Sequence, residues 1–300
     1  MMPTIRIAAA QYPIEALDNV DAYQAKVERW VADAVANRAQ LLVFPEYGAM
    51  EYAAASGAAT AGNLQASLAA VSGALAQMDA AHADLARRHG VHILAASGPS
   101  ERAGGRYVNA ARLFSPSGKM GVQEKLIMTP FERDWGISGG EGLRVFETAL
   151  GRIGIAICYD SEFPLLVRAQ AEAGADIILV PSCTEFASGY NRVRTAALAR
   201  ALENTCATVV SPTIGDAPWS PAVDRNAGAA GVFVPPDHAY SETGVMAEGI
   251  FNQPQWVYAD VALDRLREIK ASGEMRNSTD WSAQPGAAPL ARHVEVMALI

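Results

Sequence analysis

Cysteine is scarce in this chain of 300 residues, which has only Cys158, Cys183 and Cys206. An odd number of widely spaced cysteines does not form a disulfide framework, and without a paired Cys motif or a Cys/His cluster nothing supports a zinc site. Long apolar runs are also missing: no stretch reaches the ~18 residues of a membrane-spanning helix, and the N-terminus lacks the successive regions of a secretion signal. We therefore expect a reduced, cytoplasmic protein with no membrane partner and no metal.

Basic charge is limited as well. The chain has 24 Lys and Arg residues against 32 Asp and Glu residues, which gives a formal net charge of −8. A protein that neutralises phosphates usually shows the opposite balance, so nucleic acid is excluded as a main partner. Half of the residues are hydrophobic and 19% are charged, which is a composition that can fill a large core.

Strand and helix patterns alternate along the chain, and this alternation predicts an α/β fold. Five apolar runs have the length of buried strands. They are Ile5–Ala10, Leu41–Phe44, Val91–Ala95, Ile153–Ile157 and Ile177–Val180. Helical spacing of apolar residues, or a proline suited to a first helical turn, predicts four helices between and after these runs. They cover Val20 to Ala34, Leu64 to Leu85, a segment that begins at Pro164, and Arg192–Asn204.

The chain has no Ser/Gly-rich linker, so we expect one domain over residues 1–300. The last stretch, 271–300, has little periodic pattern and is interpreted as a C-terminal arm of that domain.

Three polar side chains come at or just after the ends of predicted strands. They are Glu46, Cys158 and Glu185. Ligands of α/β proteins bind beyond the carboxyl ends of the strands, so this position is the first indication of a functional site.

Cys158 stands where a strand is expected to turn into a helix, and backbone N–H groups in such a turn favour a thiolate. A small buried hydrophobe is the alternative interpretation of the same residue. A cysteine nucleophile usually needs a histidine base, but no histidine follows a predicted strand end. Glu46 is the alternative base, because an apolar setting would raise its pKa toward neutrality. It could equally be a solvated loop carboxylate.

Met120–Gln123 is predicted to be a further short strand. Lys125 follows it and precedes Glu132 by seven residues, in the segment EKLIMTPFERDW. An ammonium group can stabilise the oxyanion of a carbonyl under attack, and a neighbouring carboxylate keeps it charged. Considered alone, the pair could also be two solvated loop residues.

Taken together, the segments LLVFPE, EKLIMTPFE and ICYDSEFP resemble, in this order and spacing, the nitrilase superfamily of carbon–nitrogen hydrolases. The resemblance extends from Ile5 to about Trp281 and includes ADIILVPS, ARALEN and GVFVPPD. It implies a four-layer α-β-β-α sandwich that works without a metal or a cofactor. It also implies a homodimer or higher homo-oligomer, formed through the helices that flank the nucleophile.

The same resemblance assigns residues. Cys158 would be the nucleophile, Glu46 the general base and Lys125 the cation that faces the tetrahedral intermediate. Glu132 would position Lys125 or the substrate, and the Tyr159 backbone N–H would join the oxyanion site.

For the activity, the sequence Cys158-Tyr159-Asp160 is more similar to the amidase branches than to true nitrilases, which often have Cys-Trp-Glu. The expected function is hydrolysis of a small amide through an acyl-enzyme. Nitrile hydrolysis or acyl transfer on the same triad stays an alternative, as does an inactive binding protein of this fold. Glu185 and Arg192 are candidates for binding the substrate, whose identity the sequence does not indicate.

Overall fold

The computed structural model of the protein describes residues 4–238, 240–284 and 294–300. Its strands are β1 Ile5–Pro13, β2 Leu41–Val43, β3 His92–Arg102, β4 Arg106–Phe114, β5 Met120–Glu124, β6 Ile137–Ser138, β7 Leu143–Thr148, β8 Gly151–Ile155, β9 Ile177–Ser182, β10 Ala207–Asp216, β11 Arg225–Asn226, β12 Gly231–Phe233, β13 Val245–Glu248, β14 Gln255–Val261 and β15 Val294–Ala298. Its α-helices are α1 Val20–Ala36, α2 Glu51–Ala55, α3 Ala58–Ala61, α4 Leu64–His89, α5 Pro130–Asp134, α6 Pro164–Glu172, α7 Ala187–Asn204, α8 Leu263–Ser272 and α9 Asn277–Asp280. Three short 3₁₀ turns are η1 Gly48–Met50, η2 Cys158–Glu162 and η3 Trp281–Ala283.

The strands form two sheets that meet along one seam. The first sheet has the order β14-β1-β2-β3-β4-β5, and the second has the order β15-β7-β8-β9-β10, with β12 and β13 beyond it. The sheets join where the last residues of β1, Tyr12 and Pro13, pair in parallel with Thr213 and Ile214 of β10. The carboxyl ends of strands from both sheets therefore lie near one another.

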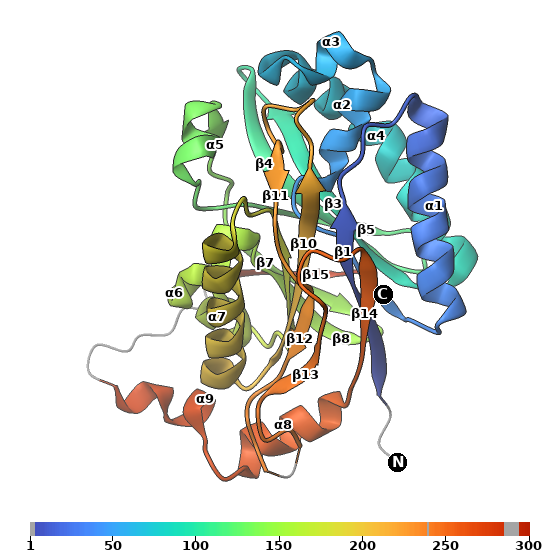
Figure 1. The fold of residues 1–300 in the computed structure, drawn as a ribbon. Coiled ribbons are helices and arrows are strands. Elements are labelled where there is room, and N and C mark those ends of the chain that lie inside the picture. Colours follow the sequence, from blue (N-terminus) through green and yellow to red (C-terminus); the bar gives the residue numbers. More distant parts are fainter. Residues whose placement is uncertain (1–3, 239, 285–293) are drawn as a thin grey trace.

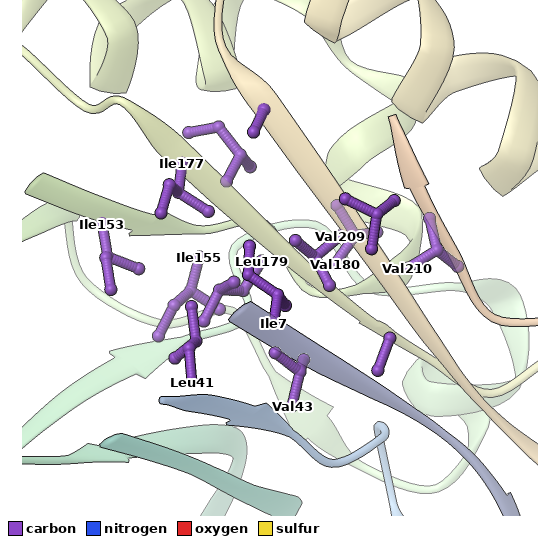
Figure 2. Close-up of a cluster of buried hydrophobic side chains, with 14 of the residues drawn as sticks. Ile7, Leu41, Val43, Ile153, Ile155, Ile177, Leu179, Val180, Val209 and Val210 are labelled. Atoms are coloured by element: carbon purple, nitrogen blue, oxygen red, sulfur yellow. The ribbon is translucent and has the colours of Figure 1, made fainter. Parts of the chain in front are cut away.

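The two sheets face each other across a hydrophobic core. Alternate residues of β1 separate cleanly: Ile7 and Ala9 belong to the core between the sheets, whereas Ala8 and Ala10 belong to the core under α1 and α4. This separation follows from the pleat, because successive side chains of a strand point to opposite faces. Figure 2 shows the contact between the sheets, with side chains of β1 and β2 next to those of β8 and β9.

Helices cover the outer faces of both sheets, with α1 and α4 on one side of the molecule and α6 and α7 on the other (Figure 1). This arrangement is the four-layer α-β-β-α sandwich that the sequence analysis expected. The five apolar runs correspond to β1, β2, β3, β8 and β9, the short predicted strand Met120–Gln123 to β5, and the four predicted helices to α1, α4, α6 and α7. In the described part of the chain, no helix is long and apolar enough to cross a membrane.

The sequence analysis missed a strand near the C-terminus. Val294–Ala298 forms β15, which pairs in parallel with β7 of the same chain, and Leu299 packs into the core between the sheets. Part of the predicted arm thus completes the second sheet of its own chain. Residues 285–293 of that arm lie outside the described residues. The strand was missed because none of its five residues is fully buried, so it lacks the strict alternation of apolar and polar side chains that indicates a half-buried strand.

Candidate active site

Cys158 lies directly beyond β8, at the first position of the turn η2. Its backbone has a φ of +47°, a left-handed conformation that is costly for a residue with a side chain. The hydroxyl of Ser161 donates a hydrogen bond of 2.6 Å to the Cys158 carbonyl, and the Arg200 guanidinium of α7 donates one of 3.1 Å to the Ser161 carbonyl. These contacts hold a sharp turn that presents the thiol at the end of its strand.

Glu46 lies beyond β2 in the other sheet and is almost completely buried. The Lys125 Nζ atom, which follows β5, lies 2.7 Å from the Glu46 Oε1 atom and 2.7 Å from the Glu132 Oε2 atom. Glu46, which is 79 residues from Lys125 in the sequence, thus forms one buried cluster with Lys125 and Glu132. The structure brings together the residues that sequence analysis grouped.

Glu132 is held in place by its own helix. It is the third residue of α5, where it forms a capping box with Thr129, and the Tyr47 hydroxyl donates a hydrogen bond of 2.9 Å to its Oε1 atom. Burial alone would raise the pKa of Glu132, but the Lys125 ammonium and these donors outweigh it and lower that pKa. Glu132 therefore stays ionised beside Lys125.

Lys125 likewise stays protonated. Burial disfavours an ammonium, but the carboxylates of Glu46 and Glu132 outweigh burial and raise the pKa of Lys125 well above its usual value. An ammonium has three N–H donors, and the two carboxylates occupy two of them. One N–H is left for a further acceptor.

The Cys158 thiol adjoins Glu46. Burial, followed by the negative charge of Glu46, raises the pKa of Cys158 well above the usual value of a thiol. Burial also raises the pKa of Glu46, although Lys125 and the hydrogen bond with Cys158 act in the opposite direction. The expectation that the turn favours a thiolate was therefore wrong: burial and the carboxylate outweigh the local N–H groups, and the resting group is a thiol.

Two buried residues that the sequence analysis missed complete the cluster. The side-chain amide of Asn109, in the middle of β4, donates hydrogen bonds of 2.9 Å to Glu46 Oε1 and 3.3 Å to Glu132 Oε1. The Ser97 hydroxyl of β3 donates a bond of 2.8 Å to the side-chain carbonyl oxygen of Asn109, which fixes the orientation of the amide. No sequence signal marked Asn109 except a polar residue inside an apolar strand.

Tyr159 follows Cys158, and no hydrogen bond from its backbone N–H is recorded among the described residues. Its ring packs edge-on against Phe163, with 4.9 Å between the ring centroids. The role of this N–H as an oxyanion donor stays a prediction.

The two candidate substrate residues differ in their surroundings. Glu185 is half-buried in the segment between β9 and α7, two residues after Cys183, whose carbonyl oxygen lies 3.8 Å from the Cys158 sulfur. The side chain of Arg192 is 61% exposed and lies 3.4 Å from the Glu162 carboxylate, which neutralises its charge. Neither residue makes a contact with the charged cluster that is recorded among the described residues.

Across the described ranges, no group of three or more His, Cys, Asp or Glu side chains has an arrangement that could hold a metal ion. The absence of a metal and of a cofactor from the reaction stays a prediction.

Comparison with known proteins identifies the family. The family model of the carbon–nitrogen hydrolases matches residues 6–271, which is most of the chain. The chain belongs to the carbon–nitrogen hydrolase family. The resemblance found in the sequence is thereby confirmed.

Curated relatives of this carbon–nitrogen hydrolase include a probable hydrolase and two amidases. A probable hydrolase of Bacillus subtilis is 42% identical over 198 residues, which cover 66% of this chain and 38% of that protein. An omega-amidase of Danio rerio is 25% identical over 62% of this chain and 67% of its own length. A deaminated glutathione amidase of Yersinia enterocolitica is 31% identical over 44% of this chain and 50% of its own length. The matches thus leave much of the Bacillus and Yersinia proteins uncovered.

Solved structures show the same fold. A carbon–nitrogen hydrolase of Helicobacter pylori superposes with a TM-score of 0.73 at 19% identity, covering 90% of this chain and 92% of that one. An amidase variant from Nesterenkonia sp. AN1, in which acrylamide has added to the active-site cysteine, superposes with a TM-score of 0.66 at 23% identity, covering 89% of this chain and 97% of that one.

Proposed function

We propose that this carbon–nitrogen hydrolase cleaves the C–N bond of a small amide through an acyl-enzyme on Cys158. The observation that carries the proposal is the buried Glu46–Lys125–Glu132 cluster beside the Cys158 thiol. Its resting charge is −1, from two carboxylates and one ammonium, so a thiolate would add a second buried negative charge. Proton transfer from the thiol to Glu46 is therefore expected to accompany attack on the substrate.

The first half of the reaction forms a thioester. The Cys158 sulfur attacks the amide carbon while the Glu46 carboxylate accepts the thiol proton. The free N–H of Lys125 and the Tyr159 backbone N–H stabilise the oxyanion of the tetrahedral intermediate. Glu46 then returns the proton to the nitrogen, the C–N bond breaks, and ammonia or an amine leaves.

The second half hydrolyses the thioester. Glu46 accepts a proton from a water molecule, and the resulting hydroxide attacks the acyl carbon. The same two donors stabilise the second oxyanion. The C–S bond breaks, the proton returns to the Cys158 sulfur, and a carboxylic acid leaves. One positioned base that acts in both halves is worth roughly 10²–10⁴ in rate.

Two observations favour amides over the alternatives. Curated relatives include an omega-amidase and a deaminated glutathione amidase, and Cys158 is followed by Tyr159-Asp160. A curated nitrilase of Pyrococcus abyssi is also similar, at 34% identity over 133 residues, and this relative keeps nitriles as the second candidate. We further propose that Glu185 and Arg192 contact the substrate.

Intact-mass spectrometry tests the reaction. We expect a small aliphatic amide, offered in parallel with an N-carbamoyl compound and a nitrile, to give the largest yield of acid and ammonia. Rapid quenching should show a mass increase equal to the acyl group, which peptide mapping assigns to Cys158. An adduct on Cys183 would contradict the assignment of the nucleophile. A clear preference for the nitrile, or acyl transfer to added hydroxylamine with no hydrolysis, would favour the alternative reactions.

We also propose that the protein forms a dimer through α6 and α7. These adjacent helices expose the side chains of Leu165 and Leu202, which are 57% and 40% accessible. A two-fold contact buries one self-complementary patch, and exposed leucines are the side chains that such a patch buries.

Light scattering at micromolar concentration tests the dimer. We expect about twice the chain mass of 31.7 kDa for the unaltered protein and a monomer for Leu202→Asp. Ile250→Asp is the matched control, because Ile250 is equally apolar and 61% exposed but lies outside both helices. A monomer before any substitution contradicts the dimer.

A further inference from the structure

Asp160 is a buried carboxylate that the reaction described above does not use. It lies in the turn η2, two residues after the nucleophile, and only 3% of its surface is accessible. Its carboxylate accepts backbone hydrogen bonds from another part of the chain. The Ile127 N–H donates to Oδ1 at 2.8 Å, and the Leu126 N–H donates to Oδ2 at 3.1 Å and to Oδ1 at 3.3 Å.

These bonds join two segments that carry reacting groups. Leu126 and Ile127 directly follow Lys125, whose own backbone N–H donates a bond of 2.8 Å to the backbone carbonyl of Asn109. Asp160 belongs to the turn that presents Cys158, which follows the second sheet, whereas Lys125 follows the first sheet. The carboxylate of Asp160 thus links the nucleophile turn to the Lys125 segment across the two sheets.

We propose that ionised Asp160 is a positioning residue that holds the Lys125 ammonium opposite the Cys158 sulfur, and that protonation of Asp160 releases this hold. The effect on turnover rests on the proposed amide hydrolysis. The effect on the two backbone N–H groups does not depend on it.

Protonation would remove part of the acceptor capacity. A carboxylate accepts on both oxygens, whereas a carboxylic acid presents one O–H donor. With Oδ1 still accepting from Ile127, the O–H at Oδ2 would face the Leu126 N–H, donor against donor. The segment that carries Lys125 would then be held by fewer hydrogen bonds.

The surroundings of Asp160 place its protonation near neutral pH. Burial raises the pKa of Asp160 to about 7, against the lowering effect of the two N–H donors and of Lys125, while Glu46 raises it further. On α7, which packs against η2, the Arg200 guanidinium is paired with the Glu203 carboxylate at 2.9 Å. Asp160 is thus ionised above about pH 7 and protonated below it.

Activity and stability respond to this titration in opposite directions. Because the folded-state pKa lies above the unfolded value near 3.8, the folded state binds the proton more tightly, and this group adds stability as the pH falls from about 7 toward 4. Positioning, in contrast, needs the ionised form and is lost over the same fall in pH. A merely structural carboxylate would not separate activity from stability in this way.

The test compares Asp160→Asn with Asp79→Asn in the full chain. The asparagine side chain would keep the size of the aspartate but present an amide donor to Leu126. The control makes the same change at a carboxylate of α4 that pairs with Arg112 and has no recorded contact with the charged cluster. We expect Asp160→Asn to lower kcat about 10- to 100-fold at pH 8.5, with little change in KM and no fall in Tm. The deficit should close as the pH falls below 7. Asp79→Asn should keep the kcat of the unaltered protein at every pH.

Residue-resolved amide exchange of the unaltered protein gives a readout without substrate. After correction for the intrinsic pH dependence, the Leu126 and Ile127 amides should lose protection relative to the Lys125 amide as the pH falls through 7. Unchanged relative protection, or a variant with the kcat profile of the unaltered protein, would overturn the proposal. A kcat loss with a large fall in Tm at every pH would also overturn it and indicate a purely structural role. If no amide is turned over at all, the proposed function fails, and the exchange measurement still decides the role of Asp160.

Discussion

Replacing Cys158 with alanine is expected to lower kcat for amide hydrolysis by on the order of 10⁴–10⁶-fold, because no thioester can form. The fold should stay intact. The sulfur makes a long contact of 3.8 Å with the Cys183 carbonyl and a hydrogen bond with Glu46, and alanine has the same Cβ as cysteine at the left-handed backbone position. Steady-state assays with a urea unfolding curve for each variant give both quantities.

Cys206→Ala is the matched control for this substitution. Cys206 is also buried, but its sulfur contacts the Arg200 carbonyl of α7 and no member of the charged cluster in the recorded hydrogen bonds. It should keep kcat within a few-fold. Turnover by the Cys158→Ala variant at the rate of the unaltered protein would exclude Cys158 as the nucleophile, and loss of folding in that variant would make the sulfur structural.

Replacing Lys125 with methionine should cost stability as well as activity. The substitution leaves the buried carboxylates of Glu46 and Glu132 without their cation, and removal of one partner of a buried ion pair typically costs about 3–5 kcal/mol. Activity should fall too, since no ammonium would face the oxyanion. Urea unfolding at pH 8 measures the first effect.

The stability deficit of Lys125→Met should depend on pH. In the unaltered protein, Lys125 lowers the pKa of Glu132, so this pair contributes stability above the unfolded pKa of a glutamate and loses it as the pH falls through the folded pKa. In Lys125→Met, burial without the cation would raise the carboxyl pKa values above the unfolded ones. The variant would then gain stability as the pH falls toward 5, and its deficit should be largest at pH 8. An equal deficit at pH 5 and pH 8 would contradict this account, and Lys270→Met should show no deficit at either pH.

The sequence predicted which residues form the site better than it predicted the protonation state of Cys158. Glu46, Lys125 and Cys158 follow strand ends in recognisable segments, and the structure brings them together. The thiolate expectation failed because the local sequence shows a turn but not the burial of that turn or the carboxylate of Glu46 beside it. Asn109 gave no signal because its importance depends on two glutamates from other elements.

For the fold too, the elements with a clear local pattern were predicted and the contacts between distant segments were not. The apolar spacing that predicted α1 and α4 arises from one buried face along a whole helix, which a sequence displays directly. β15 gives little local signal, since it has only five residues and much of its surface is exposed. Its pairing with β7, which is far away in the sequence, is not visible in a local pattern. The contacts of Asp160 with Leu126 and Ile127 depend on backbone positions, which side-chain patterns do not encode.

The seam between β1 and β10 has a consequence for how this chemistry could arise or be lost. Glu46 and Lys125 follow strands of one sheet, and Cys158 follows a strand of the other, so neither half of the chain contains all the groups of the proposed reaction. A fragment that folded into one sheet with its helices would inherit none of the reaction. Substitutions in the core between the sheets would shift one sheet relative to the other and so change the distances between these groups. The kcat of such variants would then depend on how closely the two sheets pack.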